Sequence, residues 1–123
     1  AAAEAKLNLL DTTTFHTAKC LDGSPGAFYF REANAEENAT KWVFSLEGGG
    51  ECVGLDDCSA RAHTNLGSSK NYSSVAYLGQ LQDEQTPYNP DFSTWNQVFV
   101  KYCSGDLHMG QQTAAWQTLR GLQ

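Results

Sequence analysis

Short apolar runs alternate with polar, turn-rich segments along the chain. Three of the runs are rich in β-branched and aromatic residues, which favour strands, and they cover residues 27–31, 41–46 and 95–102. Apolar side chains fill the centres of the second and third runs, so we predict that these two strands are buried. A fourth run, residues 75–81, is compatible with either a strand or a helix, because so short a run does not distinguish the two.

The segments between these runs have the composition of turns, loops and short helices. A turn at residues 22–26, DGSPG, leads into the first strand, and the polar loop 32–40 is predicted to join the first two strands into a hairpin. Residues 59–69 are predicted to form a short helix. The first residues of segment 1–19 are compatible with a frayed helical turn or with an extended arm, and the tail 111–123 is amphiphilic and lacks capping residues.

The two strands that we expect to be buried each lead into a loop that contains glycine. These loops are LEGGGEC at residues 46–52 and YCSGDLHMG at residues 102–110. In an open α/β sheet, binding and catalytic sites lie at the carboxyl ends of the strands. We therefore expect both loops at the same edge of a sheet.

Three consecutive glycines, Gly48, Gly49 and Gly50, follow the second strand. Glycine permits φ > 0 and lets a ligand approach the backbone N–H groups closely. In α/β-hydrolases, the loop after the third strand carries such a motif and donates a backbone N–H to the oxyanion of the tetrahedral intermediate. A strand followed by three glycines is also compatible with a plain turn, so these residues alone leave both interpretations open.

The composition is that of one small globular domain, with 123 residues, 18% charged residues and many aromatic side chains. The net charge of −6 argues against nucleic acid or an anionic membrane as a partner, because few side chains would neutralise phosphates. No apolar run approaches the length of about 20 residues that spans a bilayer. The start of the chain, AAAEA, would suit a mature N-terminus left by cleavage at small residues.

Cysteines and glycosylation sequons favour a secreted or lumenal protein. The four cysteines suggest two disulfides with three possible pairings, and their spacing matches no zinc motif, so no metal is expected. The sequons begin at Asn38 and Asn71, and both asparagines are candidate acceptors of N-glycans. Oxidised cysteines and N-glycans are both features of proteins that pass through the secretory pathway.

The chain offers no complete catalytic triad. It has no G-x-S-x-G motif, and none of the serines near glycine lies on a strand-to-helix elbow. We expect its three histidines to be surface or structural residues, and two aspartates to cap their own turns. The residues in question are Ser24, Ser68, Ser104, His16, His63, His108, Asp22 and Asp106. A chain with an oxyanion-type loop and no nucleophile is either part of a larger enzyme or not an enzyme.

Several segments, taken in order, resemble the pectin acetylesterase and Notum family. They are CLDGSPGAFYF (20–30), KWVFSLEGGGEC (41–52), Cys58 with Arg61, LGSSKNY (66–72), NPDFSTWNQVFVKYCSGD (89–106) and Gly110. The resemblance implies an α/β-hydrolase fold and hydrolysis of a carboxylic ester without a cofactor. It also implies that Gly49 and Gly50 supply oxyanion N–H groups, and that the catalytic Ser, Asp and His follow the region that this chain covers.

By the same resemblance, residues 1–123 are the N-terminal segment of one α/β-hydrolase domain. Residues 1–19 would be an arm, 20–110 the matching core, and 111–123 a tail that leads toward the nucleophile region. A C-terminal segment, in the same chain or a processed second chain, would complete the sheet, since parallel strands need cover on both faces. The implied disulfides are Cys20–Cys103 and Cys52–Cys58.

The resemblance predicts a secreted serine carboxylesterase that removes an acetyl or other acyl group from a polysaccharide or glycoprotein. Residues 1–123 alone would be inactive. One departure matters: Glu51 stands where the family usually has an aromatic residue, and a carboxylate beside an oxyanion opposes its charge. Glu51 is therefore both a candidate substrate contact and the reason for an alternative, a non-catalytic member with a structural or binding role in an extracellular or lumenal assembly.

Overall fold

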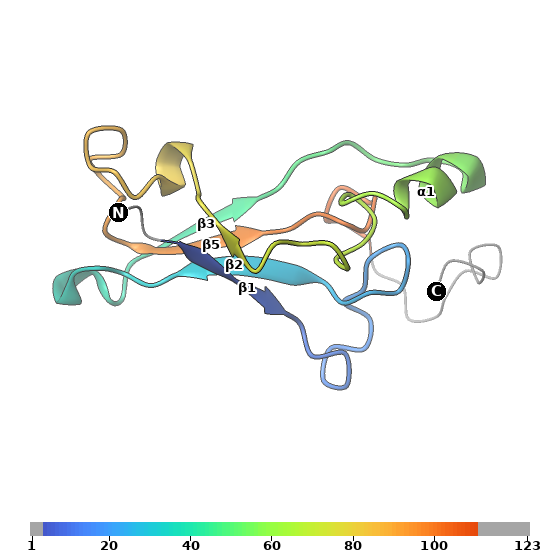
Figure 1. Cartoon of the computed structure of the whole chain (residues 1–123), viewed down its shortest axis with the longest axis horizontal. Coiled ribbons are helices and arrows are strands. Elements are labelled where there is room, and N and C mark those ends of the chain that lie inside the picture. Colours follow the sequence, from blue (N-terminus) through green and yellow to red (C-terminus); the bar gives the residue numbers. More distant parts are fainter. Residues whose placement is uncertain (1–3, 111–123) are drawn as a thin grey trace. The chain divides into compact units, whose positions relative to one another are not determined.

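The computed structural model describes residues 4–110, which form a mixed five-stranded sheet with little helix (Figure 1). The strands are β1 (Ala5–Leu9), β2 (Ala27–Arg31), β3 (Trp42–Leu46), β4 (Val75–Ala76) and β5 (Asn96–Val100). The helical elements are the α-helix α1 (Leu55–Arg61) and the 3-10 helices η1 (Glu36–Asn38) and η2 (Gln80–Gln82). The three strands predicted from the apolar runs are confirmed, and residues 5–9 of the first segment are extended, as β1.

The described residues divide into two compact units. The first consists of residues 4–8, Phe28–Leu46 and Ser73–Val100, and it contains the paired residues of the sheet. The second consists of Leu9–Ala27, Glu47–Tyr72 and residues 101–110, and it contains both disulfides and both glycine-bearing loops.

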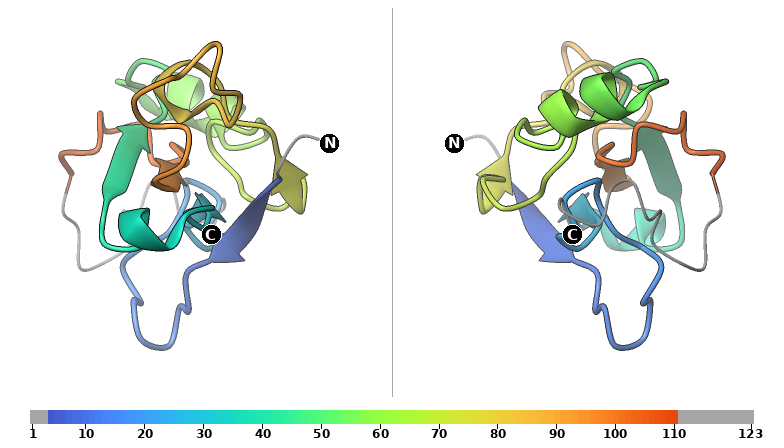
Figure 2. Two further views of the ribbon diagram at one scale, coloured as in Figure 1. Left: turned by 90° about the vertical axis from the view of Figure 1, so that its left-hand side faces the viewer. Right: turned by 90° about the vertical axis from the view of Figure 1, so that its right-hand side faces the viewer.

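The strands follow the order β3-β5-β2-β1-β4 across the sheet. β5 lies between β2, with which it is antiparallel, and β3, with which it is parallel. At the other end of the order, the short strand β4 pairs with β1 in antiparallel fashion, as both views of Figure 2 show. The sheet is mixed because β3 and β5 are parallel, whereas β2 and β5, and β1 and β4, are antiparallel.

The predicted hairpin between residues 27–31 and 41–46 is wrong, because β5 separates the two strands. The polar loop between them binds the start of β5 instead of turning tightly. The Asn96 side chain accepts a hydrogen bond from the Ala33 N–H at 2.9 Å and donates to the carbonyls of Ala39 and Lys41 at 2.9 and 3.1 Å. These bonds hold the loop around β5, and β3 therefore pairs with the far side of that strand.

The burial predicted for the second strand is also wrong for the described residues. β3 is at the edge of the sheet and pairs only with β5. Its side chains alternate in exposure, and Trp42, Phe44 and Leu46 are 46%, 66% and 61% exposed. Burial is confirmed for β5, whose first three residues are buried. The apolar run at residues 41–46 thus gives one largely exposed apolar face, on which the Trp42 and Phe44 rings stack at 6.0 Å.

The predicted helix at 59–69 overlaps the observed helix only at residues 59–61. α1 begins earlier because Asp56 and Asp57 occupy its first turn, where carboxylates stabilise the N-terminal end of a helix. Asp57 Oδ2 also accepts a hydrogen bond from the Val53 N–H at 3.1 Å. The ambiguous run 75–81 divides into β4 and the beginning of η2. The tail 111–123 lies outside the described residues.

A buried polar layer packs the segment after η2 onto the sheet. Arg31, on β2, is 6% exposed and donates to the carbonyls of Gln82 and Ser93 at 3.0 and 3.2 Å. Gln82 in turn donates from Nε2 to the Val98 carbonyl at 2.9 Å. Burial lowers the pKa of Arg31, although nearby acidic groups favour its charged form. Buried polar groups need such partners, so this layer fixes the segment in one position.

Candidate functional site

The two loops predicted to lie at one sheet edge are in contact. β3 and β5 are parallel, so their carboxyl ends point the same way. Residues 47–52, the glycine loop, follow β3, and residues 102–110, the second loop, come after β5. The Cys52 N–H donates to the Gly105 carbonyl at 3.1 Å. The prediction that the two loops come together is therefore confirmed.

Hydrogen bonds from three side chains hold the carbonyl groups of the glycine loop. At its first residue, the Glu47 carbonyl oxygen lies 2.8 Å from Nε2 of His108. Toward its end, the Gly50 carbonyl accepts from the Tyr102 hydroxyl at 2.8 Å and from Arg61 Nη1. The loop is thus clamped on both sides of its central glycines.

The backbone N–H groups at the centre of the glycine loop are free, in contrast to the carbonyl groups at its ends, which accept hydrogen bonds. In the hydrogen bonds among residues 4–110, the N–H groups of Gly48, Gly49, Gly50 and Glu51 are not donors, and all four residues are exposed. Gly49 has φ of 153° and Gly50 has φ of 72°, which L-residues rarely adopt. Successive free N–H groups in such backbone are suited to bind an anion or a developing oxyanion.

Space around the three glycines differs sharply. A Cβ atom on Gly49 would lie 2.8 Å from Leu66 Cδ2 and 3.2 Å from Tyr102 Cδ1. A Cβ atom on Gly48 or Gly50 would meet nothing within 4 Å. Gly48 is also outside the positive-φ region. Gly49 is therefore constrained by both conformation and packing, Gly50 by conformation alone, and Gly48 by neither.

The carboxylate of Glu47 fixes the beginning of the glycine loop. Its Oε2 atom lies 2.7 Å from Lys101 Nζ, and its Oε1 atom accepts the Tyr102 N–H at 2.9 Å. The side chains of Lys101 and Glu47 are only 14% and 22% exposed, so water screens this ion pair less than a surface pair. Lys101 Nζ also lies 4.7 Å from the ring centroid of Tyr72.

Glu51, the residue that departs from the family pattern, is exposed. Its carbonyl accepts a long hydrogen bond from Arg61 Nη2 at 3.5 Å. Its side chain is adjacent in sequence to the oxyanion candidates Gly49 and Gly50. A role for Glu51 as a substrate contact remains a prediction.

The structure contains the disulfides Cys20–Cys103 and Cys52–Cys58, the two pairings that the resemblance implies. Cys52–Cys58 joins the glycine loop to α1, the helix that carries Arg61. Cys20–Cys103 joins the segment before β2 to the second loop, and its two cysteines are 83 positions apart in sequence. Both bridges therefore restrain the loops of the candidate site.

Asp22 and Asp106 cap their own turns, as predicted: Asp22 Oδ1 accepts the Ser24 N–H at 3.0 Å, and Asp106 Oδ1 accepts the His108 N–H at 3.1 Å. Ser24 donates to Asp22 Oδ1, and Ser104 donates to Asp106 Oδ1, both at 2.5 Å. Ser24 also accepts the Ser69 N–H at 2.9 Å. No serine hydroxyl among residues 4–110 is hydrogen bonded to a histidine. This part of the chain thus brings together no Ser–His pair that would act as a nucleophile and base.

Asp22 is held in its ionised form. Burial raises its pKa, but hydrogen bonds from Ser24 and Ser68 and the charge of Lys70, 3.5 Å away, outweigh burial and place the pKa below its usual value. This carboxylate organises the turn DGSPG and binds the segment 67–70 through Ser24 and Lys70.

The two sequons occupy different environments. Asn71 is exposed. Asn38 is only 8% exposed, and its Nδ2 atom, the atom that a glycan would modify, donates to the Thr94 hydroxyl at 2.7 Å. Glycosylation of both residues remains a prediction, and the folded structure favours Asn71 over Asn38.

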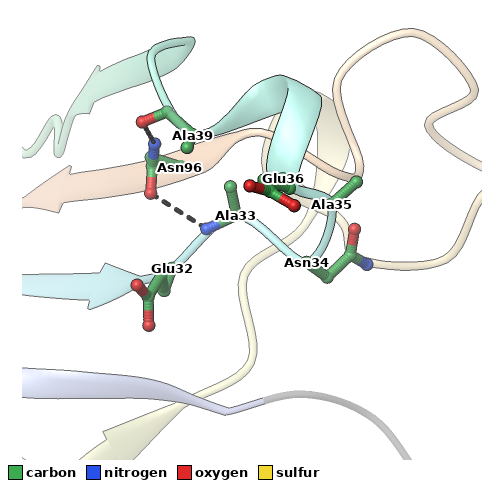
Figure 3. Close-up of a pocket in the computed structure, with 7 residues that line it drawn as sticks. All are labelled: Glu32, Ala33, Asn34, Ala35, Glu36, Ala39 and Asn96. Atoms are coloured by element: carbon green, nitrogen blue, oxygen red, sulfur yellow. Dashed lines mark hydrogen bonds between the residues drawn. The ribbon is translucent and has the colours of Figure 1, made fainter.

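A separate pocket of about 250 Å³ lies in the first unit (Figure 3). Its lining contains no serine, cysteine or histidine and no residue of the glycine loop. The Asn96 amide at its wall is occupied by its bonds to Ala33 and Ala39. The pocket therefore offers no hydroxyl, thiol or imidazole nucleophile. The lining residues are Glu32, Ala33, Asn34, Ala35, Glu36, Ala39 and Asn96.

Residues 4–110 contain neither a candidate metal site nor a membrane-spanning helix. No group of three or more His, Cys, Asp or Glu side chains is arranged to hold a metal ion. No helix of this part of the chain has the length and apolarity to cross a membrane.

Comparison with a solved structure defines the class of fold. The Wnt deacylase Notum from Drosophila superposes with a TM-score of 0.79 and 28% sequence identity, over 93% of this chain and 32% of that one. Together with the mixed sheet and the loop after β3, this identifies the fold as part of an α/β-hydrolase domain.

The sequence comparisons then define the family. The pectinacetylesterase profile matches residues 1–121, so the chain belongs to the pectinacetylesterase family. Pectin acetylesterase 4 of Arabidopsis thaliana is 37% identical over 113 residues, which are 91% of this chain and 27% of that protein. The palmitoleoyl-protein carboxylesterase Notum of Schmidtea mediterranea is 36% identical over 96 residues, 76% of this chain and 18% of that protein. The chain thus spans about a quarter, or less, of the length of these relatives.

Sequence reasoning identified the glycines of the site but missed most of the side chains that hold them. His108 was assigned a surface or structural role, and Tyr102 and Glu47 were not singled out. Arg61 was part of the family resemblance but had no assigned role. A usable signal was present, since Glu47, Tyr102 and His108 all lie within the two glycine-bearing loops that were predicted to meet.

Proposed function

We propose that this chain is the oxyanion-hole segment of a secreted serine carboxylesterase that removes an O-acyl group from a polysaccharide or a glycoprotein. One observation carries the proposal: the glycine loop presents consecutive free N–H groups, while side chains donate hydrogen bonds to the carbonyls of Glu47 and Gly50 at its two ends. Gly49 and Gly50 would donate to the oxyanion. The names of the relatives, pectin acetylesterase and palmitoleoyl-protein carboxylesterase, support ester hydrolysis as the reaction.

The proposed reaction is acyl transfer through a serine ester. The hydroxyl oxygen of a serine outside residues 1–123 attacks the ester carbonyl while a histidine takes its proton, and the carbonyl oxygen becomes an oxyanion. The N–H groups of Gly49 and Gly50 stabilise this charge. The intermediate collapses, the alcohol leaves with a proton from the histidine, and water then hydrolyses the acyl-serine. The remaining N–H donor would follow the nucleophile, in the remainder of the domain, on the same chain or on a processed second chain.

Secretion is supported by the two disulfides and by the exposed sequon at Asn71. The substrate classes follow from the relatives. The acyl group would be an acetyl group on a polysaccharide, as in the name pectin acetylesterase, or a longer acyl group on a protein.

Glu51 supports a second candidate, a catalytically inactive member with a structural or binding role. Its carboxylate is adjacent in sequence to the free N–H groups, and a negative charge near an oxyanion raises the energy of that oxyanion. Labelling and hydrolysis assays on the complete protein decide between the two candidate functions. Labelling by a fluorophosphonate, which modifies active-site serines, and release of acetate from acetylated pectin or of 4-nitrophenol from 4-nitrophenyl acetate support the enzyme. The absence of both labelling and hydrolysis supports the inactive alternative.

Gly49→Ala tests the role of the glycine loop in that protein. The added Cβ would displace the loop from Leu66 and Tyr102 and disfavour φ of 153°, so kcat for 4-nitrophenyl acetate should fall by about 10²–10³-fold, the cost of losing an oxyanion donor. Gly48→Ala is the matched control, because its Cβ meets nothing within 4 Å, and kcat should stay within about threefold. Equal kcat values in wild type and Gly49→Ala would refute the oxyanion role.

A further inference from the structure

The second loop contains two consecutive non-glycine residues in left-handed backbone conformation. Leu107 has φ of 58° and His108 has φ of 60°. Few non-glycine residues adopt this region, in which Asn, Asp and His are enriched, and a bulky residue such as Leu107 does so where surrounding contacts enforce it. Such strain accumulates at functional sites, so the contacts of these two residues need an explanation.

Hydrogen bonds from backbone N–H groups to two side chains enforce the conformation. Asp106 accepts the His108 N–H at Oδ1 and the Gly110 N–H at Oδ2, both at 3.1 Å. The Leu107 N–H donates to the hydroxyl of Tyr102 at 2.9 Å. Tyr102 is 1% exposed, so the acceptor for Leu107 is rigidly placed.

This conformation brings the His108 ring to the glycine loop. The imidazole lies 4.7 Å from the Tyr102 ring, and its Nε2 atom lies 2.8 Å from the Glu47 carbonyl oxygen. A carbonyl oxygen only accepts hydrogen bonds, so Nε2 carries the proton and donates. The Glu47 carbonyl and the Gly48 N–H belong to one planar peptide, and fixing the oxygen also fixes the direction of that N–H.

The opposite end of the glycine loop has a comparable anchor. The Tyr102 hydroxyl and Arg61 both donate to the Gly50 carbonyl. The peptides between these anchors, which carry the N–H groups of Gly49 and Gly50, have no side-chain donor on their carbonyls among the described residues. Their direction therefore depends on the two ends of the loop, and at the β3 side His108 acts on the backbone carbonyl of Glu47 while Lys101 and the Tyr102 N–H hold its carboxylate.

We propose that His108 is a positioning residue of the oxyanion hole. By donating from Nε2 to the Glu47 carbonyl, it holds the glycine loop in the conformation that presents the N–H groups of Gly49 and Gly50. It acts through the backbone and does not contact the reacting atoms. The catalytic consequence rests on the proposed esterase function, whereas the positioning itself is a statement about the structure.

Two substitutions in the complete protein separate the hydrogen bond from the ring contact. His108→Phe keeps a ring against Tyr102 but removes the donor, while His108→Gln keeps a side-chain N–H donor without the ring. With 4-nitrophenyl acetate, we expect His108→Phe to lower kcat about tenfold with KM within about twofold, since a misplaced group costs rate rather than binding. His108→Gln should recover most of the lost kcat. Wild-type kcat in His108→Phe, or an equal loss in both variants, would overturn the proposal.

A structural readout keeps this inference apart from the esterase proposal. NMR of ¹⁵N-histidine-labelled protein should show His108 with its proton on Nε2, and crystal structures should show the glycine loop displaced in His108→Phe. If the wild-type protein hydrolyses no ester, the proposed function fails, and these readouts still decide the positioning role. A proton on Nδ1 alone, or an unchanged glycine loop in His108→Phe, would overturn it.

Discussion

At the residue scale, Asp22 makes the stability of the protein depend on pH. Its pKa in the folded state is lowered, so the ionised carboxylate stabilises the fold above the unfolded pKa of about 3.9, and this contribution is lost as the pH falls through the lower folded value. Asp22→Asn should therefore lower Tm at pH 7, and the difference from wild type should shrink below about pH 4. Thermal unfolding of the complete protein across this pH range measures both effects.

Asp91→Asn is the control for this experiment, because Asp91 is an exposed carboxylate in the same chain. Its substitution should change Tm little at any pH, since surface substitutions away from specific contacts are usually within about 0.5 kcal/mol. A Tm difference for Asp22→Asn that stays constant from pH 7 to pH 3 would contradict the assignment to this carboxylate.

Some residues of the candidate site can be predicted from the sequence, and others cannot, for a physical reason. Gly49 and Gly50 could be proposed because they follow a predicted strand and lie in the segment 41–52 that resembles the family. His108 is not visible, because its role depends on a contact with a backbone carbonyl 61 positions away in sequence. Any residue type has a carbonyl, so such a contact leaves no pattern at the accepting position.

At the scale of elements, the strands were predictable and their pairing was not. Local apolar pattern and β-propensity located β2, β3 and β5, because both signals act within a few residues. The neighbour of each strand depends on distant contacts, such as those of Asn96 with the loop 33–41. The start of α1 was missed because its N-cap, Gly54, makes no side-chain hydrogen bond and the first turn is marked only by two aspartates.

The two disulfides should contribute unequally to stability. In the chain-entropy model, a bridge stabilises the fold more when it closes a longer loop. The sequence separations of 83 for Cys20–Cys103 and 6 for Cys52–Cys58 correspond to about 4.5 and about 2.2 kcal/mol in that model. Replacing each pair by serines in the complete protein and measuring denaturant unfolding checks the order. A larger loss of unfolding free energy for the Cys52–Cys58 pair would contradict it.

At the scale of the whole molecule, the exposed apolar face of β3 is the feature that the described residues leave unexplained. Trp42, Phe44 and Leu46 share this face, and contiguous apolar surface of this kind marks an interaction site. β3 is also an edge strand, whose free backbone groups are suited to pair with a further strand. The chain spans about a quarter of the length of its relative pectin acetylesterase 4. We propose that the remainder of the domain covers this face of β3.

Phe44→Ser tests that proposal in the complete protein. If the remainder of the domain covers β3, Phe44 is a core residue there despite its 66% exposure in residues 4–110, and its loss should lower the unfolding free energy by about 3 kcal/mol. Tyr88→Ser is the matched control, since Tyr88 is 73% exposed but lies in a loop outside the sheet, and it should cost less than about 0.5 kcal/mol. Denaturant unfolding measures both variants. Equal, small effects would mean that the apolar face stays open to solvent and that its aromatic residues serve a partner instead.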